Sequence, residues 1–484
     1  MLTRIDTGLN ARDSFRKPAH RQADEYCDAD GPALLLALEE PAFITNTPTF
    51  IKRDLHKIAV GIRQRTVAGC VDPHDPFCSS NSLVLRPLNN CALLQLYYGE
   101  VAKARALTQY SLDIVSGFLR AGAPDGWGIW VIAAQVNMAR LAALEGDCDE
   151  AVSIYRSLLD LVTGRSDYRV GEVLVQKELC SRTVSLVGEH TANRGDVVGD
   201  TIASCLQGSC KAFLITRRYE QLLKFMAEVE RDERLRAFAP ELLFLECRAR
   251  SLAGLGRSMD AVELIHDALK GDSAAQNDRP GLVLLQAQME ASLGLEPNKA
   301  LDALEQRLVQ SAENRPAAWY LLYRCALVHM IEAAWNRCEA LLAPMHLIAN
   351  SLRDQVAMMK TGAMELVLHS TRASWTTNIE ATLQSRFDWL GTVYYRLESA
   401  VGFLQLASIA RKMDGMPLFA EKCTVAGIAR ARSTSLHLAR QLAQAAAFPA
   451  REDAGARDSF THPEIELLYD EVLHRPYAET AMGL

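Results

Sequence analysis

The 484-residue chain lacks several features that define common protein classes. No stretch reaches the roughly 18 uninterrupted apolar residues that a membrane-spanning helix needs, so we expect no membrane partner. The segment 1–30 carries scattered charges and no apolar core, so we expect no secretory signal there. Aromatic residues make up only 7%, and the 17 prolines are few enough to favour a helix-rich chain over a β-rich one.

The motifs of several enzyme classes are also absent. The phosphate-binding loop, the Gly-x-Ser-x-Gly turn of hydrolases and the His-Glu-x-x-His motif of zinc proteases do not occur. The net charge of −7 gives no general attraction to nucleic acid, and the basic stretch 422–440 has few aromatic residues for base stacking. We therefore expect no nucleic-acid partner, no cofactor and a non-enzymatic protein.

Twelve cysteines are spread along the chain, and several lie inside apolar helical stretches. Scattered cysteines of this kind usually act as small buried hydrophobic residues that stay reduced in the cytosol. We therefore expect a cytoplasmic location. Cys205 and Cys210 lie about one turn apart on an expected helix, where packing is their expected role.

One phrase recurs with constant spacing: a glycine followed five residues later by an alanine. It occurs at Gly99 and Ala104, at Gly146 and Ala151, and at Gly256 and Ala261. Each glycine follows an apolar helical run, and each alanine opens another. Glycine tolerates the left-handed backbone that ends many helices, and a small alanine lets two helices approach closely. The phrase predicts tight turns between antiparallel helices, and its recurrence is typical of a helical solenoid.

The clearest unit spans 130–161, and a second spans 241–270. Weaker units are indicated around Leu222, Cys338 and Ala420. These units resemble the tetratricopeptide repeat family, most strongly at Gly146, Ala151 and Tyr155, and at Gly256, Ala261 and Ala268. The aromatic residue that the family has near the start of its first helix is mostly absent, and the unit lengths are irregular.

The resemblance implies an all-α fold, an α-solenoid of antiparallel helical hairpins wound into a superhelix with a concave groove. It also implies a protein–protein interaction or peptide-binding role, as in an adaptor or scaffold. Within it, Arg140 and Arg250 each lie six residues before the turn glycine of their unit. Lys211 takes the same place if Leu222 corresponds to Ala151. In the family this place faces the groove, so the three residues are candidate contacts for an acidic segment of a partner. The alternative is that they are solvated side chains on exposed helix faces.

A loop at 70–78 is the densest cluster of potential metal ligands, with Asp72, His74 and Asp75 between two cysteines. Its Cys-x7-Cys spacing differs from that of zinc sites, and aspartate before proline commonly starts turns. The loop nevertheless supports an alternative function: an enzyme, or an accessory protein of a biosynthetic pathway, with a site near Cys70 and Cys78.

The sequence predicts five segments. These are a flexible segment at 1–30, an irregular helical section at 31–87, the repeats at 88–448, a linker at 449–461, and an amphipathic helix with a tail at 462–484. The last helix is acidic on its polar faces. It either caps the final repeat or docks in a groove, its own or a partner's.

Overall fold

The computed structural model describes residues 92, 95, 96, 99–120, 122, 127–171, 173–177, 197–239, 241–270, 279–295, 299–311, 316–352, 355–371, 379–393, 395–411, 413 and 415–447. These residues fall into two compact units, of which unit 1 ends at Phe244 and unit 2 begins at Leu245. The candidate metal loop at 70–78 and the acidic segment at 462–484 lie outside the described residues, as do the predicted segments 1–30, 31–87 and 449–461.

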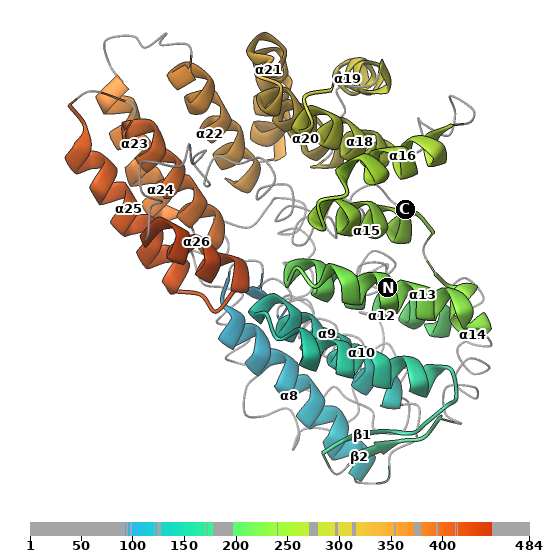
Figure 1. The fold of residues 1–484 in the computed structure, drawn as a ribbon. Helices are drawn as coiled ribbons and strands as arrows, with labels where there is room; N and C mark the ends of the chain where they lie inside the picture. Colours follow the sequence, from blue (N-terminus) through green and yellow to red (C-terminus); the bar gives the residue numbers. More distant parts are fainter. Residues whose placement is uncertain are drawn as a thin grey trace, which may run out of the picture. The chain divides into compact units, whose positions relative to one another are not determined.

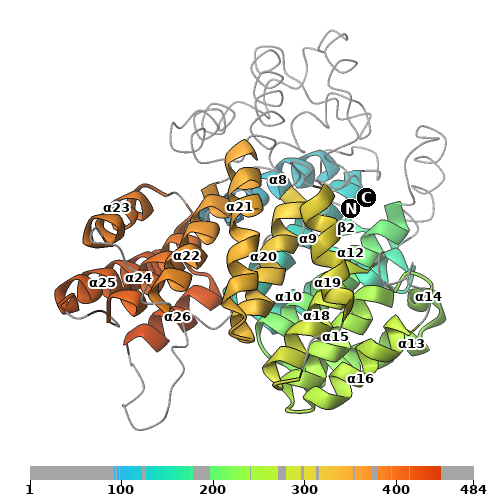
Figure 2. The same cartoon turned by 90° about the horizontal axis from the view of Figure 1, so that it is seen from above.

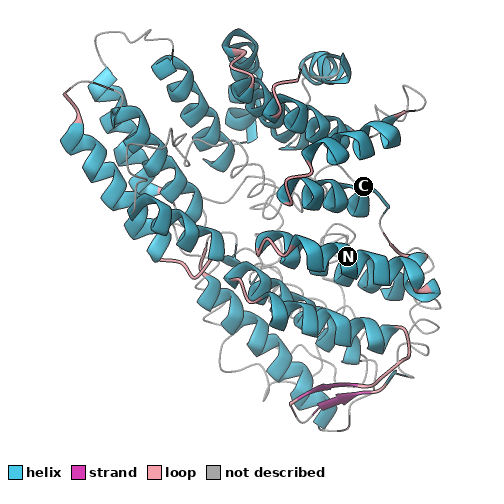
Figure 3. Cartoon of the chain, in the orientation of Figure 1, coloured by secondary structure: helices cyan, strands magenta, loops and turns pink. Residues whose placement is uncertain are grey.

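The described chain is almost entirely helical (Figures 1 and 3). Unit 1 contains α8 (Val101–Arg120), α9 (Gly128–Glu145), α10 (Cys148–Val162), α12 (Val197–Ile215), α13 (Tyr219–Arg231) and α14 (Glu233–Arg236). The boundary falls within α15 (Glu241–Gly254). Unit 2 continues with α16 (Ser258–Leu269), α18 (Pro280–Ser292), α19 (Lys299–Ser311), α20 (Pro316–Ile331), α21 (Trp335–Leu352), α22 (Gln355–Thr371), α23 (Ile379–Thr392), α24 (Arg396–Arg411), α25 (Pro417–Arg432) and α26 (His437–Ala447). Within each unit many neighbouring helices pack against each other, as the pairs α9–α10, α20–α21 and α24–α25 do.

The predicted turn recurs more often in the structure than the glycine–alanine phrase does in the sequence. A residue with positive φ ends one helix, and a residue no more than 3% exposed follows it five positions later. The six pairs are Gly99 and Ala104, Gly146 and Ala151, Arg217 and Leu222, Gly256 and Ala261, Ala333 and Cys338, and Gly415 and Ala420. Two pairs therefore use the left-handed conformation without glycine, at φ 56° for Arg217 and 57° for Ala333.

Hydrogen bonds explain why this turn is compact. The Gly146 amide donates to the carbonyl of Ala143 (3.0 Å) and the Asp147 amide to that of Ala142 (2.9 Å), which closes the end of α9. The Asp147 carbonyl then accepts the Ala151 amide, while its carboxylate accepts the Glu150 amide at 3.0 Å and caps α10. Asp147 thus closes the C-terminal end of α9 and caps the N-terminal end of α10. The same backbone pattern joins Arg217 and Arg218 to the end of α12.

A short antiparallel hairpin departs from the expected all-helical chain. Strands β1 (Tyr168–Val170) and β2 (Val173–Val175) pair with Tyr168 opposite Val175, and Gly171 in the connection has φ 57°. Its signal in the sequence is Gly171 between two short stretches that contain tyrosine and valine. Strands of three residues are too short for an alternating pattern to stand out, so the hairpin was not predicted.

The core of unit 1 lies where α9, α10 and α12 pack on one another, side by side in both views (Figures 1 and 2). Tyr155, Leu158 and Leu206 are among its largest fully buried side chains. Nearby, the ring centroids of Phe118 and Trp127 lie 4.7 Å apart, and this contact joins α8 to the start of α9. In unit 2, the rings of Trp319 and Tyr323 stack with their centroids 5.2 Å apart. The indole N–H of Trp319 donates a hydrogen bond to the hydroxyl of Thr361 on α22. Within the described residues, no helix has the length and apolar character to cross a bilayer.

Candidate functional site

The turn residues provide a common frame for the three predicted contact residues. Arg140 lies on α9, Lys211 on α12 and Arg250 on α15. Gly146, Arg217 and Gly256 follow them at the same distance of six residues, and all three have positive φ. Arg217 adopts the left-handed conformation that glycine adopts in the other two turns, so Lys211 precedes a turn residue of the same conformation as Arg140 and Arg250 do. Whether the three side chains face a groove stays a prediction.

The structure brings two of the three helices into contact. Helices α9 and α12 pack on each other, so Arg140 and Lys211 lie on neighbouring helices of unit 1. Both side chains are half-buried, which leaves part of each accessible to a ligand. Arg250 is half-buried too, but it belongs to unit 2 and is treated separately.

A tyrosine of α10 and a glycine of α12 are in contact in the same unit. Tyr155 of α10 is only 2% exposed, and its ring lies against Gly208 of α12. A Cβ atom added at Gly208 would lie 2.7 Å from the Cε1 atom of Tyr155, and closer still to Cζ and the hydroxyl oxygen. Gly208 is itself half-buried, and it precedes Lys211 by three residues on the same face of α12. The hydroxyl therefore ends beside a partly accessible stretch of α12.

The positive charge of Arg140 affects the pKa of Tyr155. Burial raises the pKa of Tyr155 well above that of a free phenol, and the positive charge of Arg140 acts in the opposite direction. The phenol consequently stays protonated at neutral pH and is a hydrogen-bond donor. The sequence showed Tyr155 only as a member of an apolar helix face. Nothing in a local pattern could pair it with Gly208, 53 residues away.

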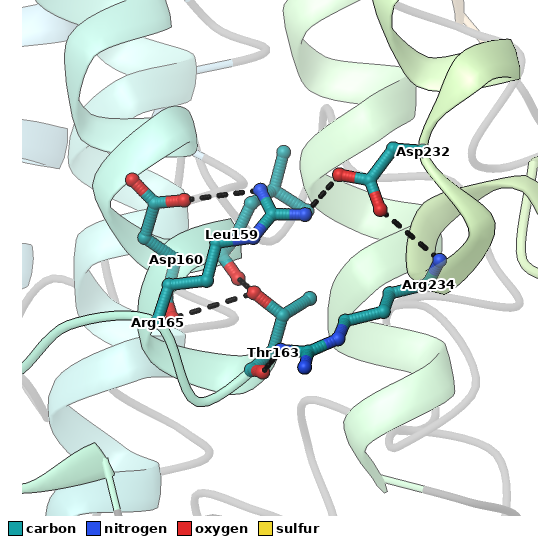
Figure 4. Close-up of polar contacts among 6 residues, drawn as sticks. All are labelled: Leu159, Asp160, Thr163, Arg165, Asp232 and Arg234. Carbon is teal, nitrogen blue, oxygen red and sulfur yellow. Dashed lines mark hydrogen bonds and ion pairs between the residues drawn. The ribbon is translucent and has the colours of Figure 1, made fainter.

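The contact between α10 and the α13–α14 segment has a different character, because ion pairs and hydrogen bonds hold it. Arg218 makes two bonds to Asp149, at 2.5 and 3.1 Å, and Arg156 bonds Glu228 at 3.0 Å. Arg165 bonds Asp160 at 3.3 Å and also Asp232, whose other carboxylate oxygen accepts the Arg234 amide (Figure 4). The Arg234 side chain in turn donates to the Thr163 carbonyl at 3.0 Å (Figure 4).

The spacing of these bonds follows the repeat. Their partners lie 67 to 72 residues apart in sequence, apart from the local Arg165–Asp160 and Arg234–Asp232 contacts. Gly146 and Arg217 are 71 residues apart in sequence, so the bonds join equivalent parts of two successive helical repeats, both within unit 1. The hydrogen bond from Arg218 lowers the pKa of the Asp149 carboxyl. These side chains already have partners, and we assign them a structural role.

A buried charged cluster joins three helices of unit 2. The His329 side chain is fully buried, with Nδ1 3.1 Å from Glu332 and Nε2 in contact with Glu305 of α19. Arg337 of α21 also bonds Glu305, at 3.0 Å. Arg337 also pairs with Asp302 of α19. The side chains of this cluster have partners within unit 2, and we assign them a structural role.

The described residues hold no metal-binding cluster, and their thiols are buried. No group of three histidine, cysteine or acidic side chains among these residues is arranged to hold a metal ion. The candidates Asp72, His74 and Asp75 lie outside the described part of the chain, so their role stays a prediction. Cys205 and Cys210 are buried free thiols, as their packing role predicts, and burial raises the pKa of Cys205.

No protein-family model matches this chain, and no curated protein or solved structure matches it with significance. The helix-rich architecture and its packed neighbouring helices are compatible with a helical-repeat protein, and the tetratricopeptide repeat family stays a prediction.

Proposed function

We propose that this chain is a tetratricopeptide-like solenoid of antiparallel helical hairpins that acts as a non-enzymatic adaptor. It binds an acidic peptide or an acidic segment of a protein partner through basic residues on the first helices of its hairpins. The observation that carries the proposal is the shared register of Arg140, Lys211 and Arg250, each half-buried and each six residues before a left-handed turn residue.

The chemistry of these side chains fits an acidic partner. A guanidinium group binds a carboxylate through two parallel hydrogen bonds, and an ammonium group adds a third donor. Partial burial strengthens such contacts, because the charges are less screened by water than those of a fully exposed pair. The seven buried free thiols of the described chain support a cytoplasmic site of action, where thiols stay reduced.

The proposal is tested by capturing partners with the full chain as bait. A double variant reverses the charges of Arg140 and Lys211 to glutamate. The matched control reverses the exposed Lys103 of α8 and Lys224 of α13, which gives the same change of net charge in the same unit. Mass spectrometry should identify a protein with an acidic segment that the wild type and the control retain and the Arg140/Lys211 variant loses.

Equal capture by all three baits would contradict the proposal. Arg250→Glu, measured alone, reports whether the equivalent position in unit 2 contributes to the same partner. Loss of the partner with Arg250→Glu but not with the unit 1 variant would move the binding site to unit 2.

A further inference from the structure

One face of α25 in unit 2 exposes two aliphatic side chains. Leu418 is 80% exposed and Val425 is 62% exposed, the two highest values among the exposed large apolar side chains of the described residues. They are seven positions apart, close to two helical turns, and therefore lie on the same face. Exposed Ala429 extends this apolar stripe by one turn. The other side of the helix packs on α24 and α26, with Ala420 and Cys423 buried (Figure 1).

Basic side chains border this apolar stripe. Lys422 and Arg432 are exposed on the same side of α25, together with one acidic neighbour, Glu421. At the C-terminal end of the helix, Arg430 donates to a backbone carbonyl of α23 at 2.8 Å. Burial and the charge of Arg396 both lower the pKa of Arg430, because a second guanidinium group is close by. The face is therefore apolar along its middle, with an excess of positive charge around it.

The chain itself carries a segment whose sequence matches this face. Residues 462–474 lie outside the described part of the chain, and their pattern predicts an amphipathic helix. Ile465, Leu468 and Val472 recur at helical spacing and span about two turns, as Leu418 and Val425 do. Acidic residues border this stripe on both sides, at Glu464, Glu466, Asp470 and Glu471. The segment and the α25 face are thus complementary in apolar pattern and in charge.

The point where the described chain ends permits a contact between the two. Helix α26 ends at Ala447 and packs on α25. Residues 448–461 can span at most about 45–50 Å, whereas α25 is only about 24 Å long. The acidic segment can therefore reach any part of the α25 face. Its covalent attachment also gives it a higher local concentration than a separate molecule has.

We propose that residues 462–474 dock on the exposed face of α25 and cover Leu418 and Val425. The apolar stripe of the segment contacts these two side chains, and its acidic residues lie near Lys422 and Arg432. The chain thus closes its last helix pair with its own C-terminal segment. The contact uses none of the basic residues of the proposed function, so the two proposals succeed or fail separately.

Hydrogen–deuterium exchange of the full chain, measured by mass spectrometry, tests the contact. The amides of residues 467–473 should exchange at least about tenfold more slowly than those of a synthetic peptide of residues 462–474. Val425→Asp removes an apolar contact and repels the acidic segment, so it should speed this exchange at least about fivefold. The matched control is Leu347→Asp on α21, because Leu347 is exposed to the same extent, 61%. Exchange in the control should stay within about twofold of wild type.

Three results would overturn the inference. The first is exchange of these amides in the wild type at the rate of the free peptide. The second is equal exchange in Val425→Asp and Leu347→Asp. The third is protection that disappears on dilution, because it would assign the face to a second copy of the chain. Protection that is unchanged on dilution supports docking of the chain's own segment.

Discussion

The ring of Tyr155 on α10 occupies the space that a side chain at Gly208 on α12 would need. This contact joins the second helix of one helical repeat, α10, to the first helix of the next repeat, α12. Gly208 is therefore required for the close approach of these two helices. Gly208→Ala should destabilise the protein by about 1–3 kcal/mol, because the added methyl group overpacks the contact. Urea denaturation measures the change.

The control for this substitution is Gly117→Ala in α8. A Cβ atom added at Gly117 would have nothing within 4 Å, so alanine there should gain about 0.5–1 kcal/mol from its higher helix propensity. Equal effects at the two glycines would show that the Tyr155 contact does not constrain α12.

The left-handed turn residues predict stability changes of opposite sign. Gly256 has φ 79° and open space around its Cβ position, so Gly256→Ala should cost about 1–2 kcal/mol through backbone strain alone. Ala333 already bears this strain at φ 57°, so Ala333→Gly should gain about 0.5–1 kcal/mol after the entropy of the unfolded glycine is counted. Thermal or urea unfolding checks both, and a stabilised Gly256→Ala protein would be inconsistent with the turn geometry.

The network around Asp232 predicts a pH dependence. Partial burial raises the pKa of this carboxyl, but the bonds from Arg165 and from the Arg234 amide outweigh it and lower the pKa below its usual value. A lowered folded-state pKa stabilises the fold above the unfolded pKa of about 4, and this stabilisation is lost as the pH falls through the folded value. Asp232→Asn should therefore cost about 1 kcal/mol at pH 7, and the difference from wild type should shrink below about pH 4.

Asp113 of α8 provides the control for this measurement, since among the described residues its carboxylate accepts a bond from Gln109, one turn earlier on the same helix. Asp113→Asn should change the stability by less than about 0.5 kcal/mol at pH 7. A difference between wild type and Asp232→Asn that grows as the pH falls toward 3 would have the wrong sign for this account.

The buried thiols predict a pattern of chemical reactivity. Burial raises the pKa of Cys205 and of Cys325, so both thiols carry less thiolate at pH 8 than a free cysteine and are also shielded from reagents. Iodoacetamide should leave both unmodified in the native protein and label both in urea, as measured by peptide mapping. Rapid native labelling of Cys205 would contradict the packing of α12 against α9 and α10.

The sequence predicted those features of the fold that depend on one residue type at fixed spacing. Gly146 and Ala151 identified their turn, because glycine favours the left-handed conformation and alanine allows helices to meet. Arg217 and Ala333 adopt the same conformation without that signal, and only the neighbouring residues Leu222 and Cys338 indicated their units.

Contacts between distant segments were not predictable in the same way. The Tyr155–Gly208 contact and the Arg165–Asp232 bond join residues that are 53 and 67 positions apart, and no local pattern specifies which partner is chosen. The register of Arg140 and Lys211 was predictable because it is measured from the turn. The contact of Tyr155 with Gly208 was not, because it depends on how α10 and α12 pack.

Binding of an acidic peptide by Arg140 and Lys211 is the central claim, and one comparison tests it most directly. The affinity for labelled hexaglutamate is measured by anisotropy for the wild type, for Arg140→Glu/Lys211→Glu and for the control Lys103→Glu/Lys224→Glu, at low and at physiological salt. We predict a loss of at least about tenfold for the first variant, a change within about threefold for the control, and weaker wild-type binding as salt is added. Equal affinities for the two double variants would contradict the claim.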